Sequence, residues 1–332
     1  MIVVTGGAGF IGSNVVAALA ERGREVVVCD LLGSDEKWRN LAKHEIADVI
    51  APERLIDYLD DGAKPGAAGA IDAIVHLGAN SSTVERDGDR ILDQTFRFTL
   101  ALWRWCTAHR VRLIYASSAA TYGDGAQGFD DDGSVAGLAR LRPLNLYGWS
   151  KHIFDRRIAR IVAGGGATPP QWVGLKFFNV YGPNEYHKAD MRSVVVQVFE
   201  RAVAGAPARL FKSHRPDYAD GGQLRDFVAV ADCVAVVLWL LDHPAVSGLF
   251  NLGTGRARSF ADLAGAVFRA LGREPRIEYV DTPLAIRDRY QYRTEARMDR
   301  LVAAGYQRPF ASLEDGVADY VKRFLAAADR YR

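Results

Sequence analysis

The chain has 332 residues, of which 49% are apolar and 25% charged, and a formal net charge of +2. This length suits one sheet-based body with a smaller lobe, and the near-neutral charge gives no argument for a nucleic-acid or membrane partner. No apolar run approaches the roughly 20 residues needed to span a bilayer, so we expect a soluble globular protein.

The first residues and the cysteine usage both indicate a cytoplasmic protein. Residues 1–5 enter an apolar run directly, with no basic leader ahead of them. Cys29, Cys106 and Cys233 lie far apart within apolar segments. This pattern is typical of buried, reduced thiols rather than of a disulfide framework or a metal site, so we expect no bound metal.

The chain begins with a predicted strand over residues 2–5, followed by a glycine-rich turn and an apolar helix. Such glycines let a backbone approach a pyrophosphate, whose charge is met by free N–H groups and by the positive end of the helix. The strand–turn–helix context, with an acid at the end of the next strand, predicts a dinucleotide site. The expected contacts are Gly6, Gly9, Phe10, Ile11 and Gly12.

A second predicted strand over residues 26–30 ends in Asp30, which could accept hydrogen bonds from a ribose diol and so favour NAD. Lys37 and Arg39 follow shortly. They could neutralise a 2′-phosphate, or they could be a solvated surface pair. Local chemistry therefore leaves NAD and NADP open, with Asp30, Leu31 and Lys37 as expected cofactor contacts.

A third predicted strand over residues 71–77 is followed by small residues that let the backbone reach the cofactor. The expected contacts here are His76, Leu77, Gly78 and Ala79. His76 could be a ligand or catalyst, but the apolar–glycine turn after it favours a hydrogen-bonded core histidine.

Three polar side chains point to chemistry on an alcohol. A long helical stretch over residues 90–109 precedes a strand over 112–117, after which Ser118 follows directly. Tyr147 and Lys151 are four positions apart, which places both on one face of a helix. A nearby ammonium lowers the pKa of a phenol and makes proton abstraction from an alcohol feasible, while Ser118 can hydrogen-bond the same oxygen. With the glycine turn, this set predicts hydride transfer.

The strand–helix alternation continues past the middle of the chain and then loosens. Residues 162–170 are rich in glycine and predict a loop, and residues 172–178 predict another strand. After residue 181 a second lobe is expected. Residues 207–223 contain few apolar side chains and predict a long loop.

The last third returns to regular patterns. A strand and an apolar helix over residues 226–241, and a strand over 248–253, are expected to rejoin the main body. Amphipathic helices over 260–271 and 313–324 are expected to build the second lobe.

Alternating strands and helices predict an α/β fold, a doubly wound parallel (Rossmann) sheet with a smaller, mostly C-terminal α/β substrate lobe. The dinucleotide-binding domain is expected over residues 1–180, with a returning segment at about 226–254. The substrate-binding lobe is expected over residues 181–225 and 255–332.

Taken together, these motifs resemble the extended short-chain dehydrogenase/reductase family, in which Ser118, Tyr147 and Lys151 would form the catalytic triad. Within it, several segments look like the heptose epimerases that act on nucleotide-activated sugars. These segments are residues 6–14, 115–123, 177–183, 187–188, 225–228, 250–255 and 289–291. The resemblance runs from residue 1 to about 320.

The resemblance implies inversion of C6 of an ADP-activated heptose through a transient ketone, in the supply of lipopolysaccharide core precursors. Tyr147 would take the hydroxyl proton, and Lys188 matches the family's second acid–base position. Desolvation could lower the pKa of that lysine enough for the task. By charge pattern alone, Lys188 would instead be a surface charge in a polar loop.

Further roles follow from the resemblance. Arg225 would pair with a diphosphate, which suits a bidentate guanidinium. Lys37 corresponds to a basic residue near the adenosine ribose and favours tightly bound NADP, with NAD still possible. A homo-oligomer is also implied. The remaining expected substrate contacts are Ser118, Asn179, Asp190, Phe211 and Tyr290, and the remaining cofactor contacts are Tyr147, Lys151, Val180 and Lys188.

Departures from the family leave the exact sugar open. Asp190 stands where a serine is common, and residues 212–223 form a longer run than expected. Another nucleotide-sugar epimerase or reductase is therefore an alternative, whereas Ala119-Ala120 after Ser118 argue against a dehydratase, which has an acidic pair there. An inactive NAD(P)-binding regulator is the alternative of a different class, and the intact triad argues against it.

Overall fold

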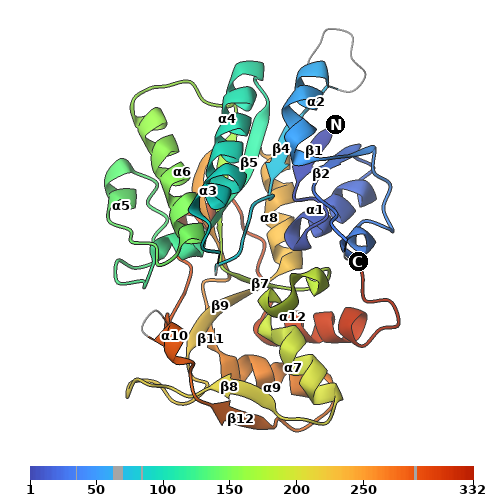
Figure 1. Ribbon diagram of the computed structural model, residues 1–332, viewed down its shortest axis with the longest axis vertical. Helices are drawn as coiled ribbons and strands as arrows, with labels where there is room; N and C mark the ends of the chain where they lie inside the picture. The colour runs from blue at the N-terminus through green and yellow to red at the C-terminus, as the bar shows by residue number, and fades with distance from the viewer. Residues whose placement is uncertain (35, 63–69, 84, 288–289) are drawn as a thin grey trace.

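The computed structural model describes residues 1–34, 36–62, 70–83, 85–287 and 290–332. A seven-stranded sheet in the order β10-β6-β5-β4-β1-β2-β3 forms the centre of the larger body (Figure 1). Every neighbouring pair is parallel. The strands are β1 (Ile2–Thr5), β2 (Val26–Cys29), β3 (Asp48–Ile50), β4 (Ala73–His76), β5 (Arg112–Ser118), β6 (Trp172–Phe177) and β10 (Gly248–Leu252). The predicted doubly wound parallel sheet is confirmed.

Helices cover both faces of this sheet, which explains why its strands are continuous apolar runs. On β1, Ile2 and Val4 share a core cluster with α1 (Phe10–Glu21) and α8 (Val230–Asp242). Val3 points the other way, into a cluster with α4 (Phe98–His109) and α6 (Leu146–Ala163). Both faces of the strand are therefore buried.

The predicted helix over residues 90–109 forms with an irregular middle. It consists of α3 (Gly88–Ile91), a π-helical segment η3 (Leu92–Arg97) and α4. Other short elements are η1 (Glu36–Asn40), η2 (Pro52–Arg54), α2 (Leu55–Gly62), η4 (Ala119–Tyr122), α5 (Val135–Ala139), η5 (Tyr186–Met191), α10 (Leu284–Arg287), α11 (Asp299–Ala303) and η6 (Val321–Leu325).

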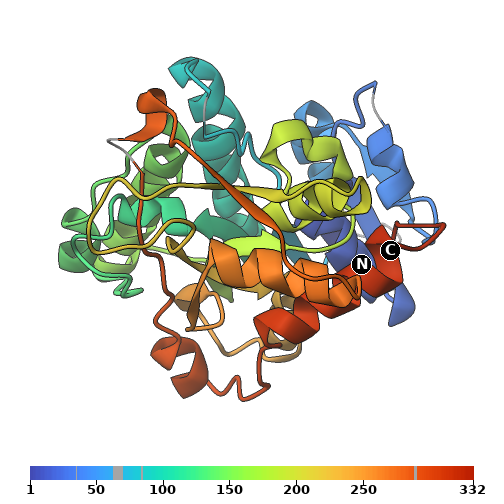
Figure 2. The same ribbon diagram turned by 90° about the horizontal axis from the view of Figure 1, so that it is seen from below.

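A smaller lobe lies below the sheet in Figure 1 and faces the viewer in Figure 2. Its three-stranded sheet has the order β11-β9-β7, and a second sheet pairs β12 with β8. Its strands are β7 (Asn179–Tyr181), β8 (Ala208–Phe211), β9 (Leu224–Ala229), β11 (Ala257–Ser259) and β12 (Ile277–Val280), and its helices α7 (Val194–Val203), α9 (Phe260–Ala270) and α12 (Leu313–Tyr320) share one core.

Two expectations for this region need correction. The segment 207–223 is not entirely a loop, because Ala208 and Leu210 point into the core of the lobe and β8 pairs in parallel with β12. The strand expected near residue 226 joins the small sheet as β9, while α8 and β10 do return to the main body.

The C-terminal residues lie against elements from the beginning of the chain, as both ribbon views show (Figures 1 and 2). Lys43 Nζ donates to the Tyr331 carbonyl at 2.6 Å, and Arg332 pairs with Glu21 at 3.0 Å. The Arg332 amide donates to Asn184 Oδ1 at 3.0 Å. This segment, residues 326–332, is called the tail below. Among the described helices, none is long and apolar enough to cross a membrane.

Candidate active site

A cavity of about 720 Å³ opens at the carboxyl ends of the parallel strands, beside the smaller lobe. Ligands of open α/β sheets bind at this edge. Sixteen of the predicted site residues line the cavity: Gly6, Gly9, Phe10, Ile11, Gly12, Asp30, Lys37, Leu77, Gly78, Ala79, Ser118, Tyr147, Lys151, Asn179, Val180 and Lys188. Leu31, His76, Phe211, Arg225 and Tyr290 are not part of that lining. The side chain of Asp190 lies outside the described structure.

The glycine-rich turn fits a dinucleotide because its backbone is packed too closely for side chains. Gly6 has a φ of +65°, and a Cβ there would lie 2.6 Å from the Gly78 nitrogen. A Cβ on Gly12 would lie 2.0 Å from the Gly6 carbonyl oxygen. At the start of α1, Gly9 provides no side-chain cap, so N–H groups of the first helical turn are available to a phosphate.

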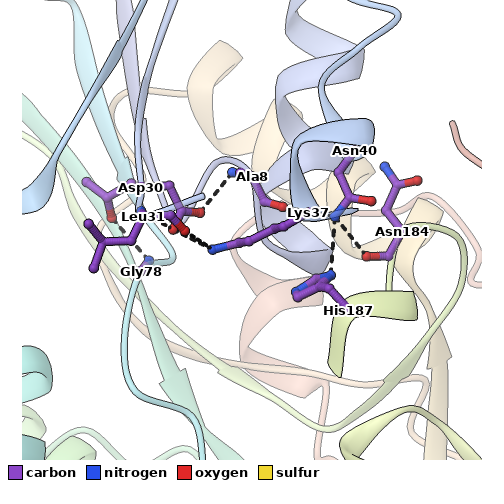
Figure 3. Close-up of polar contacts among 9 residues, drawn as sticks. Ala8, Asp30, Leu31, Lys37, Asn40, Gly78, Asn184 and His187 are labelled. Atoms are coloured by element: carbon purple, nitrogen blue, oxygen red, sulfur yellow. Dashed lines mark hydrogen bonds and ion pairs between the residues drawn. The ribbon is translucent and has the colours of Figure 1, made fainter. Parts of the chain in front are cut away.

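Asp30 and Lys37 form an ion pair beside this turn (Figure 3). Asp30 Oδ1 accepts from Lys37 Nζ at 2.6 Å and from the Leu31 amide at 2.8 Å, and Oδ2 accepts from the Ala8 amide at 2.9 Å. Lys37 reaches Asp30 from η1. A carboxylate and an ammonium therefore meet where the adenosine ribose of a dinucleotide would lie.

His76 lies behind the cavity wall and is completely buried. Its Nδ1 is 2.6 Å from Thr5 Oγ1, and its Nε2 is 2.7 Å from Thr99 Oγ1. Burial, with a smaller contribution from the charge of Lys151, lowers the pKa of His76 to about 3. Thr5 in turn accepts from the Gly78 amide at 3.1 Å, so an uncharged His76 supports the strand ends around the cofactor turn.

Helix α6 presents Tyr147 and Lys151 to the cavity. Asn145 caps this helix by accepting from the Gly148 amide at 2.8 Å, which places Tyr147 in the first turn. A Cβ on Gly148 would lie 2.7 Å from the Ala120 carbonyl oxygen, so a glycine is needed for the close approach of α6 to η4. Ser118, at the end of β5, hydrogen-bonds Tyr147.

The two titratable groups of α6 are strongly affected by burial. Burial lowers the pKa of Lys151 to about 8, while the charge of Asp155 raises it. Burial also raises the pKa of Tyr147, and the hydrogen bond with Ser118 lowers it. The expected lowering of the phenol pKa by Lys151 does not appear here, because desolvation of the phenolate raises the pKa of Tyr147 and the hydrogen bond with Ser118 is what opposes it.

A buried ion pair anchors α6 beneath these groups. Asp155 Oδ2 accepts from Lys176 Nζ at 2.8 Å and from Ser117 Oγ at 2.6 Å. Lys176 Nζ also donates to Thr121 Oγ1 at 2.7 Å. The side chains of Asp155 and Lys176 have no exposed surface, so the pair joins α6 to β5, β6 and η4 inside the protein.

Lys188 reaches the same cavity from a separate element, η5. Its Nζ lies 5.3 Å from the centre of the Phe10 ring. Burial lowers the pKa of Lys188, and the nearby charge of Glu185 raises it. Tyr147 and Lys188 therefore bring acid–base groups from different elements into one cavity.

Comparison with known proteins identifies the family of this chain. The model of the NAD dependent epimerase/dehydratase family matches residues 2–253. The chain belongs to this family. The family match and the fit of the glycine turn support a nicotinamide cofactor.

Family members at high identity share one name. The ADP-L-glycero-D-manno-heptose-6-epimerase of Nitratidesulfovibrio vulgaris (strain DP4) is 50% identical, with all of both chains covered. A protein of the same name from Fusobacterium nucleatum is 43% identical, again with all of both chains covered. These relatives confirm the resemblance to the heptose epimerases, and the chain is an isomerase.

Solved structures of the family have the same fold. The Helicobacter pylori ADP-L-glycero-D-manno-heptose-6-epimerase is 27% identical with a TM-score of 0.77, covering 97% of this chain and 95% of that one. The Thermus thermophilus UDP-glucose 4-epimerase in complex with NAD is 25% identical with a TM-score of 0.74, covering 98% and 99%.

Three predicted substrate contacts of this family member form a cluster next to the cavity. The Arg225 guanidinium lies 5.3 Å from the centre of the Tyr290 ring, and the rings of Tyr290 and Phe211 are 6.1 Å apart. Arg225 also lies 5.5 Å from the centre of the Phe260 ring, and Phe260 lines the cavity. Arg289, quoted with Tyr290 in the resemblance, lies outside the described residues.

Sequence reasoning missed several lining residues. Ser81 and Ser82 follow the predicted contact Ala79 closely, and their place after a strand end was a usable signal. His187 was noted beside Lys188 but given no role; burial lowers its pKa to about 4. Arg192 also lines the cavity, and nothing in its local sequence marks it. Within the described residues, no cluster of three potential metal ligands occurs.

Proposed function

We propose that this chain inverts C6 of ADP-D-glycero-D-manno-heptose to give ADP-L-glycero-D-manno-heptose, through a transient ketone. The observation that carries the proposal is the placement of Tyr147 and Lys188, from α6 and η5, in one cavity with a dinucleotide-binding turn. The relatives at 43–50% identity that bear this enzyme's name support the choice of sugar. The product would supply lipopolysaccharide core synthesis.

The acid–base roles follow from the residues on α6, β5 and η5. Tyr147 would accept the C6 hydroxyl proton, and Ser118 would hydrogen-bond the same oxygen. The ammonium of Lys151 would stabilise the phenolate form of Tyr147 that takes up this proton. Lys188 would accept or donate the hydroxyl proton for the opposite configuration at C6. A bound nicotinamide cofactor supplies the reversible two-electron oxidation of the substrate.

The substrate diphosphate would bind to Arg225. Arg225 as a whole residue is 9% exposed, and the one hydrogen bond of its guanidinium in the described structure is to the Leu224 carbonyl, at 2.8 Å. Burial lowers the pKa of Arg225, and no carboxylate pairs with it among the described residues. A desolvated, forked cation of this kind suits a diphosphate. Asn179, Asp190, Phe211 and Tyr290 would complete the sugar and nucleotide contacts.

For the cofactor we propose tightly held NADP rather than NAD. Asp30 already accepts three hydrogen bonds, from Ala8, Leu31 and Lys37, which leaves few lone pairs for a ribose diol. Lys37 offers an ammonium to a 2′-phosphate at the same place. A homo-oligomer in the cytoplasm remains a prediction that sedimentation and cell fractionation would check.

The function is tested by incubating the purified protein with ADP-D-glycero-D-manno-heptose and following the C6 configuration by NMR, without added cofactor. We expect inversion by the wild type. Tyr147→Phe should abolish turnover, because the phenylalanine cannot accept the proton, while cofactor binding stays intact. Tyr279→Phe, an exposed position on β12, is the matched control and should retain activity.

Two results would contradict the proposal. An absence of inversion would remove the epimerase activity on this sugar. Stoichiometric consumption of added NADPH would instead favour the alternative, a nucleotide-sugar reductase of the same family.

A further inference from the structure

The turn that carries Lys188 has an unusual backbone. Asn184 has a φ of +72° and Ala189 a φ of +45°, so left-handed conformations occur on both sides of Lys188. Residues other than glycine adopt this region at an energetic cost, and they persist there only where their surroundings hold them. Contacts around residues 182–193, called the Lys188 turn below, must therefore fix its shape.

One buried carboxylate joins the two ends of the Lys188 turn. Glu185 is completely buried. Its Oε1 accepts from the Gly182 amide at 3.4 Å and from Ser193 Oγ at 2.7 Å, and its Oε2 accepts from the Ser193 amide. Oε1 also accepts from the Tyr320 hydroxyl at 3.1 Å, which ties the turn to α12.

The charge on Glu185 follows from these partners. The two amides can only donate, so they favour the ionised carboxylate. Burial raises the pKa of Glu185, while the hydrogen bonds from Ser193 and Gly182 and the charge of Lys188 lower it. The charge of Glu185 acts back on Lys188, where it opposes the effect of burial.

The first half of the turn has separate anchors on the cofactor side. Asn184 Nδ2 donates to Ser13 Oγ at 3.0 Å. Asn40 Nδ2 donates to the Asn184 carbonyl at 3.2 Å (Figure 3). Asn14 Nδ2 donates to the Pro183 carbonyl at 3.0 Å. These contacts fix residues 183–184, whereas Glu185 joins this half to Ser193, on the far side of Lys188.

We propose that Glu185 is the positioning residue that holds Lys188 in the cavity for its half of the reaction. The inference rests on the proposed function, in which Tyr147 and Lys188 serve opposite configurations at C6. Glu185 does not line the cavity, so it acts through the shape of the turn and through its charge beside the lysine. If Glu185 were needed only for folding, its loss would slow the reaction of both epimers equally.

The test separates the two halves by starting from each epimer in turn. Enzyme loaded with oxidised cofactor is mixed rapidly with ADP-D-glycero-D-manno-heptose or with ADP-L-glycero-D-manno-heptose, and the absorbance of reduced nicotinamide is followed. The oxidation of each epimer begins with proton transfer to the base that lies on the side of its C6 hydroxyl. Loss of one base should therefore slow the first oxidation of one epimer. The other epimer should be oxidised at the normal rate, so that reduced cofactor accumulates with it.

We expect Glu185→Gln to slow the oxidation of one epimer by at least about tenfold, part of the ~10²–10⁴-fold that a positioned acid–base group contributes. The affected epimer should be the one that Lys188→Met slows. Asp232→Asn is the matched control, because it removes the charge of another buried carboxylate, which lies on α8 outside the Lys188 turn and accepts from the Ala311 amide at 2.9 Å. It should leave both rates near those of the wild type.

The possible outcomes are distinguishable. Equal slowing of both epimers by Glu185→Gln would overturn the positioning role, as would the same asymmetry in Asp232→Asn. Lys188→Met without any asymmetry would remove Lys188 from the proposed function, and no inversion by the wild type would remove that function altogether. If Glu185→Gln does not fold, Tyr320→Phe replaces it: a smaller slowing of the same epimer supports the proposal, and no asymmetry overturns it.

Discussion

The charge pair at the end of β2 lies where the proposed preference for NADP over NAD would be decided. Asp30 and Lys37 have opposite charges and opposite preferences: the carboxylate suits a ribose diol, and the ammonium suits a 2′-phosphate. Their contact at 2.6 Å neutralises the carboxylate and keeps the lysine beside the same position. Removal of the lysine should therefore weaken binding of the phosphorylated cofactor selectively.

We predict that Lys37→Met weakens NADP binding by about 10–100-fold, the loss expected for a charge-assisted hydrogen bond, and weakens NAD binding much less. Dissociation constants from isothermal titration calorimetry would measure both effects. Arg39→Met is the matched control, since Arg39 lies in the same short helix and pairs with the exposed Glu36. Equal losses for both cofactors would show that Lys37 does not select the phosphate.

Individual site residues were predictable where their chemistry depends on local spacing. The glycines of the first turn and the Tyr147–Lys151 pair each occupy one short segment. Glu185 was not predictable in this way, because its partners Gly182, Ser193 and Tyr320 meet only in the folded chain. An acid near a lysine in a polar segment usually indicates only a solvated surface.

At the scale of elements, helix α6 depends on a buried ion pair as well as on apolar packing. Asp155 lies one turn beyond Lys151, and Lys176 reaches it from β6. Removal of one partner of such a pair leaves an uncompensated charge in the interior. The position of the helix that carries Tyr147 should therefore be sensitive to Lys176.

We predict that Lys176→Met lowers the free energy of unfolding by about 3–5 kcal/mol, because it strands the Asp155 carboxylate. Urea denaturation followed by circular dichroism would measure this loss. Lys212→Met removes an exposed pair with Asp281 and should cost less than about 1 kcal/mol. Similar losses for the two variants would mean that the buried pair adds nothing beyond a surface contact.

The main-sheet elements were largely predictable because strands buried on both faces are continuous apolar runs. Strand β8 was missed because its alternating run is only 4 residues long, and its partner β12 lies far along the chain. The π-helical segment inside the helix over residues 90–109 was also missed. An apolar periodicity does not distinguish a single wide turn from regular helix.

At the scale of the whole molecule, the tail connects the Lys188 turn with α1, the helix that follows the first strand. Arg332 contacts Glu21 on α1 and Asn184 in the turn, and Tyr186 donates to the Arg330 carbonyl at 2.7 Å. The tail therefore joins the larger body to the η5 region at the protein surface, in addition to the contacts around the cavity.

We predict that Arg332→Ala leaves global stability within about 1 kcal/mol, because its ion pair is partly exposed. Hydrogen exchange of the amides at residues 185–188 should become faster, while exchange in the main sheet stays unchanged, since local opening requires less free energy than global unfolding. Hydrogen–deuterium exchange with mass spectrometry would measure this. Unchanged exchange in the turn, or faster exchange everywhere, would contradict a local role for the tail.

The contact between Glu21 and Arg332 also bears on the order in which parts of the protein can fold during synthesis. The two residues are 311 positions apart. At translation rates of about 5–20 residues per second, roughly 15–60 s pass between the synthesis of one and of the other. The glycine turn and its helix can form early on the ribosome, but the Lys188 turn gains its last support only when the tail has emerged.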